Sequence, residues 1–319
     1  NQIETLIIQP NIDPYNKFEF LSQSQQNDIL LSQVDSTIGY RKNDSTAAPL
    51  LIVAPETFTN DITVNYYDRS RTWNSFTSYL KDYPNVNLLF GASSYEYVQS
   101  ALPPSKTARR LNDHGGWYEA HNSALMVDGS ARTEIFHKSK LVVAVEKTPY
   151  PGIFCKIDDM LGGVMGRCVG QDEISLLNVR DVEGNDVKIG CAVCYESVYG
   201  EYYTDYIRKG AKAMTVITND AWWGDTPGYR QHLSYACLRA IETRRAIARC
   251  ANTGISAIIS PSGEIIKETK WWEPATLRGS LPLRYDMTFF VTHGDIIGRV
   301  CTFMFLMLLL ALAVRFRTL

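Results

Sequence analysis

Short apolar runs rich in β-branched residues alternate with longer amphipathic stretches along most of the 319-residue chain, and turn residues separate them. Alternation of this kind predicts an α/β protein. The expected strands are 5–8, 50–54, 87–91, 123–127, 133–136, 187–193, 213–218, 256–260 and 264–267. The expected helices are 22–34, 72–82, 202–209 and 231–248.

Two predicted hairpins share one design, because residues 123–129 and 256–263 each run from an apolar strand into a turn that ends in glycine. A second strand follows each turn, which is the usual sequence signature of a β-hairpin. The repetition favours two sheets with related strand pairs over a single parallel barrel.

The end of the chain differs from the rest, since the 15 residues between Arg299 and Arg315 carry no charge. As a helix they would cover about 22 Å, short of a bilayer core of about 30 Å. Counting from Ile296, with Arg299 reaching the interface, gives nearly enough length. A buried core helix would show polar residues with a 3.6-residue period, and this run shows almost none. We therefore expect a transmembrane helix over 296–314.

The flanks of this helix bear on orientation. Arg315 and Arg317 follow it, and the positive-inside tendency then puts the large preceding domain outside the cytoplasm. The chain opens on Asn1 with neither an initiator Met nor a signal-like basic and apolar region. We expect a fragment or a processed product, whose missing part is either a cleaved signal or an upstream membrane region.

Composition narrows the classes of function. Lys and Arg total 32 against 34 Asp and Glu, a net charge of −2, so no global basic field exists to hold nucleic acid. With 45% hydrophobic and 21% charged residues, the chain is neither disordered nor collagen-like. The mean hydropathy of −0.16 averages a polar globular part with one apolar segment.

Seven cysteines leave at least one thiol free in a monomer without intermolecular bridges. Cys194 follows the apolar run 187–193 and precedes a predicted helix, a place that exposes a nucleophile beside free backbone N–H groups. Cys191 and Cys194 also form a C-x-x-C, which suggests a redox or zinc site. The absence of a second cysteine pair argues against zinc, and side chains three residues apart on a strand face opposite ways. We expect no metal and no cofactor.

A nucleophilic cysteine needs a base, yet none of the five histidines stands in a context typical of a Cys-His pair. Glu56 ends the strand-like run 50–56, and Lys138 ends the run 133–138. Either residue alone would be taken for an ordinary surface charge. Together with Cys194 they are three strand-end residues of the types that nucleophilic catalysis requires.

This set resembles the Glu-Lys-Cys triad of the carbon–nitrogen hydrolase (nitrilase) superfamily, and the resemblance covers nearly the whole chain. The matching stretches are 8–12, 54–57, 118–125, 136–142 with Glu146, 194–196, 218–225, 231–242 and 252–256. The Asn-Asp-Ala-Trp segment within 218–225 and the apolar C-terminus are most similar to the apolipoprotein N-acyltransferase branch. Membership implies an α-β-β-α sandwich over 1–290, the C-terminal transmembrane helix, and an upstream bundle of membrane helices that this chain lacks.

The resemblance also implies a reaction. A fatty acyl chain would pass from a phospholipid to Cys194 as a thioester, and then to the N-terminal amine of a diacylglyceryl-cysteine apolipoprotein. Glu56 would be the general base, and Lys138 would stabilise the oxyanion together with a backbone N–H at or after Cys194. Glu146 would position Lys138 or Glu56. Tyr195 and Glu196 are expected to support the site.

The candidate substrate-binding residues are Phe18, Asn219, Trp222 and Trp223. Phe18 stands where related enzymes often carry Trp, and the two tryptophans are candidates for touching lipid headgroups, with packing as the equal alternative. The loop before Glu146 departs from the family pattern, because Val143-Ala144-Val145 replaces its Pro and Gly. The spacing from Lys138 to Glu146 is kept.

The resemblance places the protein as a monomer in a bacterial inner membrane, with its catalytic domain on the periplasmic side and with phospholipid, diacylated apolipoprotein and membrane lipid as partners. Two alternatives stay open. A soluble amidase or nitrilase would hydrolyse a small C–N bond, which the membrane segment argues against. A tethered binding protein with an inactive hydrolase fold is disfavoured by the complete Glu-Lys-Cys set.

Overall fold

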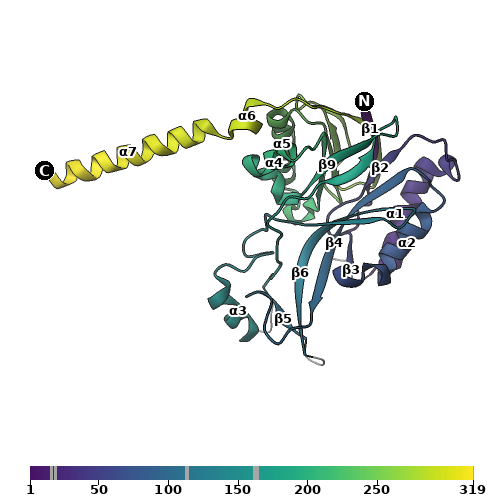
Figure 1. The fold of residues 1–319 in the computed structure, drawn as a ribbon, viewed down its shortest axis with the longest axis horizontal. Helices are drawn as coiled ribbons and strands as arrows, with labels where there is room; N and C mark the ends of the chain where they lie inside the picture. Colours follow the sequence, from purple (N-terminus) through teal and green to yellow (C-terminus); the bar gives the residue numbers. More distant parts are fainter. Residues whose placement is uncertain (15–16, 18–19, 112–114, 161–164, 319) are drawn as a thin grey trace.

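The computed structural model describes the chain except residues 15–16, 18–19, 112–114, 161–164 and 319. Two sheets pack face to face, with α1 and α2 outside one sheet and α4 and α5 outside the other (Figure 1). These helices span Gln23–Ile38, Arg71–Leu80, Gly200–Arg208 and Gly228–Thr243. The predicted α-β-β-α sandwich is confirmed.

The first sheet has the order β14-β1-β2-β4-β6-β5, with β3 on β4 and β7 on β6. Its strands are β1 (Gln2–Gln9), β2 (Leu50–Val53), β3 (Thr59–Thr63), β4 (Val86–Val98), β5 (Arg109–Arg110), β6 (Trp117–Asp128), β7 (Thr133–His137) and β14 (Ala275–Pro282). The second sheet has the order β13-β12-β11-β10-β9-β8. Its strands are β8 (Leu177–Arg180), β9 (Asp186–Val193), β10 (Ala213–Thr218), β11 (Ile247–Ala251), β12 (Ala257–Ile259) and β13 (Ile265–Glu268).

Strand β1 shows how the layers arise from the sequence. Ile3 and Ile7 pack into the core shared with the second sheet, whereas Leu6 and Ile8 pack into the core beneath α1 and α2. Successive side chains of a strand point to opposite faces, so a strand that is apolar at nearly every position suits a sheet covered on both sides.

The predicted helix 231–248 is wrong at its end. Helix α5 stops at Thr243, and Arg244 adopts a left-handed backbone with φ of 53°. The following residues form β11, a central strand of the second sheet with every residue buried. The apolar run after Arg245 is short enough to be a buried strand, and periodicity alone does not separate the two cases.

Short elements complete the fold. They are α3 (Pro151–Met160), α6 (Phe289–His293) and the 3₁₀ turns η1 (Gly39–Arg41), η2 (Val64–Arg69), η3 (Cys194–Val198) and η4 (Asp220–Trp223).

Helix α7 (Ile296–Thr318) projects away from the sandwich at the yellow end of the chain (Figure 1). Among the described residues, its segment Ile296–Phe316 is the one helix long and apolar enough to cross a membrane, and none of that apolar stretch is buried against the protein. A C-terminal apolar helix therefore forms where the sequence predicts one.

Candidate active site

Cys194 lies at the turn where β9 ends and η3 begins. Its backbone is left-handed, with φ of 52°, a conformation that crowds the β-carbon of any residue except glycine. The Cys194 carbonyl accepts a hydrogen bond from Ser197 Oγ at 2.8 Å and lies 3.1 Å from His232 Nε2. These contacts behind the residue hold the turn, and the thiol is left on the opposite side.

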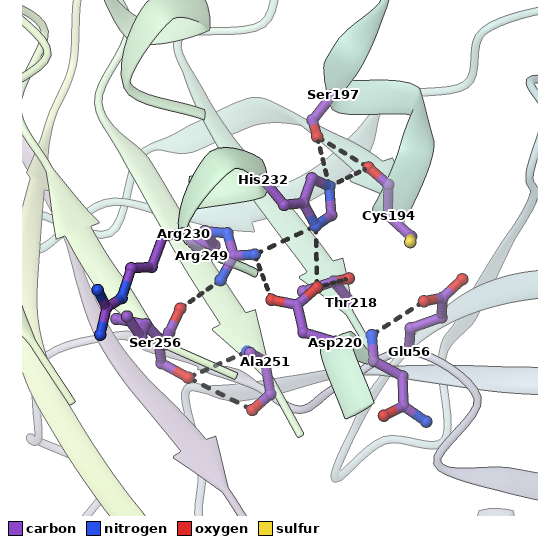
Figure 2. Close-up of polar contacts among 12 residues, drawn as sticks. Glu56, Cys194, Ser197, Thr218, Asp220, Arg230, His232, Arg249, Ala251 and Ser256 are labelled. Carbon is purple, nitrogen blue, oxygen red and sulfur yellow. Dashed lines mark hydrogen bonds and ion pairs between the residues drawn. The ribbon is translucent and has the colours of Figure 1, made fainter. Parts of the chain in front are cut away.

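A buried ionic network stands behind this turn. Asp220 Oδ2 lies 2.6 Å from Arg249 Nη2, and Asp220 Oδ1 lies 2.9 Å from His232 Nδ1 (Figure 2). Thr218 Oγ1 donates to the same carboxylate at 2.9 Å. Burial opposes ionisation of Asp220, but Arg249 and His232 outweigh it and hold its pKa well below the usual range.

Glu56 follows β2 and lies where the chain passes very close to the neighbouring strand β4. A β-carbon at Gly91 would lie 2.5 Å from the Glu56 Cα, so this close approach requires glycine. Glu56 Oε1 accepts hydrogen bonds from Asn122 Nδ2 at 2.7 Å and Lys138 Nζ at 3.2 Å, and Oε2 accepts one from the Asn219 backbone N–H at 3.0 Å. The carboxylate is therefore held from three directions.

Lys138 lies between two carboxylates. Its Nζ is 2.8 Å from Glu146 Oε1, and the Asn122 amide donates to the same oxygen at 2.7 Å. Glu146 Oε2 accepts the Val142 N–H at 2.8 Å, which closes the loop that lacks the family's Pro and Gly. Burial opposes the charge on Lys138, but the adjacent carboxylates of Glu56 and Glu146 outweigh it and raise its pKa, so the ammonium persists.

One cavity of about 560 Å³ brings the three candidate catalytic residues together, and its lining is mainly apolar. The lining includes Glu56, Lys138 and Cys194, with Tyr95, Asn122, Val142, Val145, Glu146, Cys168, Tyr195, Asn219, Trp222 and Trp223. In Figure 2 the Cys194 thiol points to the side where Glu56 lies. Burial is the main cause that raises the pKa of the Cys194 thiol, and the Glu56 carboxylate raises it further, although Lys138 lowers it. The resting residue is therefore a neutral thiol.

Cys191, by contrast, is buried in the core between the sheets, where burial raises its pKa to about 12. It does not line the cavity with Cys194. All seven cysteines are free, and the C-x-x-C spacing does not form a thiol pair facing one site.

Glu196 lies outside the cavity but connects its walls. Its carboxylate accepts backbone hydrogen bonds from Ser139 at 2.6 Å, Lys140 at 3.1 Å and Val193 at 2.8 Å. It therefore joins the residues after Lys138 to the residue before Cys194. Tyr195 borders the cavity, and its ring packs edge-to-face against that of Tyr199, with the ring centroids 5.3 Å apart.

The candidate substrate-binding residues have different placements. Asn219 is buried and reaches Glu56 through its backbone, as described above. Trp222 and Trp223 are 64% and 46% exposed at the cavity edge. Phe18 lies outside the described residues.

Sequence reasoning assigned no role to Asn122 or to the network of Asp220, His232 and Arg249. A signal for Asn122 was available, because the 123–129 hairpin pairs Ser123 with His137 and thereby places Asn122 beside Lys138. The Lys138 N–H donates to the Asn122 carbonyl at 2.8 Å. The ionic network joins η4, α5 and β11, and no local spacing links those segments.

Comparison with known proteins gives relatives and fold neighbours. Residues 97–285 match the sequence profile described as Carbon-nitrogen hydrolase. An apolipoprotein N-acyltransferase of Chlorobaculum tepidum is 28% identical over 99% of this chain and 58% of its own length. That of Geobacter metallireducens is 37% identical over 36% of this chain and 22% of its own length. The chain thus spans little more than half of the first relative and under a quarter of the second.

Solved structures share the fold at low identity. Nit3 of Saccharomyces cerevisiae, described as a member of branch 10 of the nitrilase superfamily, aligns with a TM-score of 0.58 and 15% identity over 88% of this chain and 90% of its own. A variant of an amidase from Nesterenkonia AN1 aligns with a TM-score of 0.56 and 14% identity over the same shares. Both comparisons support the two-sheet sandwich.

Proposed function

Because the chain belongs to the carbon–nitrogen hydrolase family, we propose that it is the catalytic part of an apolipoprotein N-acyltransferase, with residues 1–290 as the catalytic domain. The observation that carries the proposal is the mainly apolar cavity shared by Glu56, Lys138 and Cys194, in a chain that ends in an exposed apolar helix. The relatives named apolipoprotein N-acyltransferase support the same choice.

In the first half-reaction, Glu56 takes the Cys194 proton as the sulfur attacks the ester carbonyl of a phospholipid. The Lys138 ammonium and a backbone N–H at or after Cys194 stabilise the oxyanion. Glu56 then protonates the departing alkoxide, which leaves as a lysophospholipid, and the acyl group stays on Cys194 as a thioester. The raised pKa of Cys194 supports this order, since a neutral thiol needs a base at the moment of attack.

In the second half-reaction, the N-terminal amine of a diacylated apolipoprotein attacks the thioester. Glu56 takes the amine proton and returns it to the Cys194 sulfur, which restores the thiol and leaves an amide. Glu146 and Asn122 hold Lys138 and Glu56 at their separation through both steps.

Both substrates are anchored in a bilayer, so the proposal also concerns location. We infer that α7 crosses a bacterial inner membrane, with the catalytic domain on the periplasmic face and the exposed Trp222 and Trp223 near the lipid headgroups. The protein would act there as a monomer that meets its lipid substrates by lateral diffusion.

The test is acylation of the protein in vesicles of phosphatidylethanolamine. Peptide mass spectrometry should find a fatty acyl group on Cys194 that hydroxylamine removes. Cys194→Ala should abolish it, and Cys237→Ala, a partly exposed cysteine outside the cavity, should not.

Absence of the adduct in the wild-type protein, or equal acylation of Cys194→Ala, contradicts the proposal. Release of ammonia from small amides without acyl transfer would indicate the amidase alternative.

A further inference from the structure

Three side chains of metal-ligand type lie on one face of the first sheet, beside the candidate active site. Strands β4 and β6 pair with Glu96 opposite Glu119 and Ser94 opposite His121. Residues directly opposite each other project from the same face, so Glu96, Glu119 and His121 share a face. One ligand atom of each lies within 4.8 Å of the others.

The two glutamates are poorly accommodated without a cation. Like charges directly opposite on neighbouring strands destabilise a sheet. Glu119 Oε1 is removed from solvent and has no hydrogen-bond partner among the described residues. A positive ion between the carboxylates would offset both costs.

His121 is the third member and is only 5% exposed. Its Nδ1 lies 2.7 Å from the Val169 carbonyl oxygen, and a carbonyl only accepts, so Nδ1 carries the hydrogen. In the neutral ring Nε2 then presents a lone pair, and within the described part of the chain it has no hydrogen-bond partner. Glu96 Oε2 lies 3.8 Å from Nε2, too far for a hydrogen bond. An ion about 2.0–2.2 Å from each atom would bridge them.

We propose that Glu96, Glu119 and His121 bind one divalent transition-metal ion, with zinc as the test ion. An imidazole with two carboxylates suits zinc or a similar metal better than calcium or magnesium, which favour oxygen ligands throughout. Metal-bound histidines commonly donate their other N–H to a carbonyl, as His121 does. Glu96 is partly exposed, which gives an ion access from solvent.

The proposed metal site lies partly on β6, the strand that also forms part of the cavity wall. Asn122, the next residue of β6, projects to the other face and donates to Glu56 and Glu146. Residues 168–169 contact both His121 and Glu146. The Val169 carbonyl accepts a hydrogen bond from His121 Nδ1, and the N–H of Cys168 donates to the Glu146 carbonyl at 2.7 Å. An ion bound to His121 would therefore hold β6 more rigidly against residues 168–169. The inference does not depend on the proposed acyl transfer.

The experiment uses the whole chain, freed of metal by chelation, incubated with ZnCl₂ and passed through gel filtration. Elemental analysis should find one zinc per chain. The double variant Glu96→Gln, Glu119→Gln should bind zinc at least about tenfold more weakly. The matched control, Glu173→Gln with Glu264→Gln, removes two exposed glutamates elsewhere and should bind as the wild type does.

Thermal unfolding separates a metal site from a merely structural pair. Zinc should raise the Tm of the wild type and of the control but not of Glu96→Gln, Glu119→Gln. Without metal, the double variant should be at least as stable as the wild type, because the charge repulsion is gone. A double variant that still gains Tm with zinc would overturn the proposal.

Free cysteines are the competing ligands, and cobalt distinguishes them. Co²⁺ bound at this site should give a spectrum without thiolate-to-metal charge transfer, and Cys194→Ala should retain it. A sulfur-ligated spectrum, or no zinc retained after gel filtration, also counts against the site.

Discussion

The two sides of Cys194 hold buried charge in different ways. On the cavity side one ammonium, Lys138, is shared by two carboxylates, Glu56 and Glu146, at 3.2 and 2.8 Å. On the far side the guanidinium of Arg249 pairs with the single carboxylate of Asp220, and both side chains are fully buried. The first cluster borders a cavity and carries an excess of acid, whereas the second is closed.

The two clusters therefore have different roles: the cavity side is suited to reaction, and the far side supports the structure. An excess carboxylate beside a neutral thiol gives the proton somewhere to go, so the cavity side is suited to change its protonation during a reaction. A matched pair out of contact with solvent keeps its charges through any such step and fixes the Cys194 carbonyl through His232. Substitutions on the two sides should therefore fail in different measurements.

The largest effect is expected from Glu56→Gln. It removes the proposed base and should slow acylation of Cys194 by about 10²–10⁴-fold. Stability should change by no more than about 1 kcal/mol, since Lys138 keeps Glu146 as its partner. Acylation rates measured on this variant check the predicted loss of activity, and urea unfolding of the same sample checks the predicted stability. A variant that acylates at the wild-type rate would remove Glu56 from the mechanism.

On the far side, Arg249→Met should cost about 3–5 kcal/mol of stability, because it leaves Asp220 buried and unpaired. The folded-state pKa of Asp220 is lowered, so its contribution is complete above an unfolded pKa of about 3.9 and is lost as pH falls below it. In Arg249→Met the buried, unpaired Asp220 carboxyl favours its neutral form, so the pH profile should shift: the variant should lose less stability than the wild type as pH falls.

Urea unfolding across pH 3–7 measures that shift, with the double variant Asp220→Leu, Arg249→Met as control, which should recover part of the stability. An Arg249→Met protein as stable as the wild type would contradict the assigned role.

The pH dependence of Cys194 reactivity should distinguish the two acids. Glu56 raises the thiol pKa more than Asp220 does, so Glu56→Gln should move the iodoacetamide alkylation profile of Cys194 to lower pH further than Asp220→Asn. Peptide mass spectrometry at Cys194 gives the rates, and Glu264→Gln should leave them unchanged. Equal shifts in the two variants would show that the sides are not electrostatically distinct.

The smallest effect is expected from Ser197→Ala, which removes one hydrogen bond to the Cys194 carbonyl. A loss of about 0.5–1.5 kcal/mol in urea unfolding is expected, with acylation retained, because His232 still contacts the same oxygen. Loss of acylation in a folded Ser197→Ala protein would move this residue into the catalytic set.

The sequence alone predicts the features that depend on short-range patterns of apolar and polar residues. The strand ends at Glu56, Lys138 and Cys194 follow from apolar runs, and the structure brings the three to one cavity. Strand β14 was not predicted, because its residues are mostly half-exposed and it pairs with β1 across the whole chain. Arg249 has no predicted role, because the predicted helix 231–248 covers the start of β11 and hides the strand that carries this residue. Contacts between distant segments depend on register and burial, which local pattern does not encode.

The left-handed backbone at Cys194 has a consequence for how this position can vary. Glycine is the residue that would relax this conformation, and such strain costs of order 1–3 kcal/mol. Selection for stability alone would therefore favour Cys194→Gly, a change that deletes the thiol. The thiol at this turn therefore comes at a cost in stability that a position with a purely structural role would avoid.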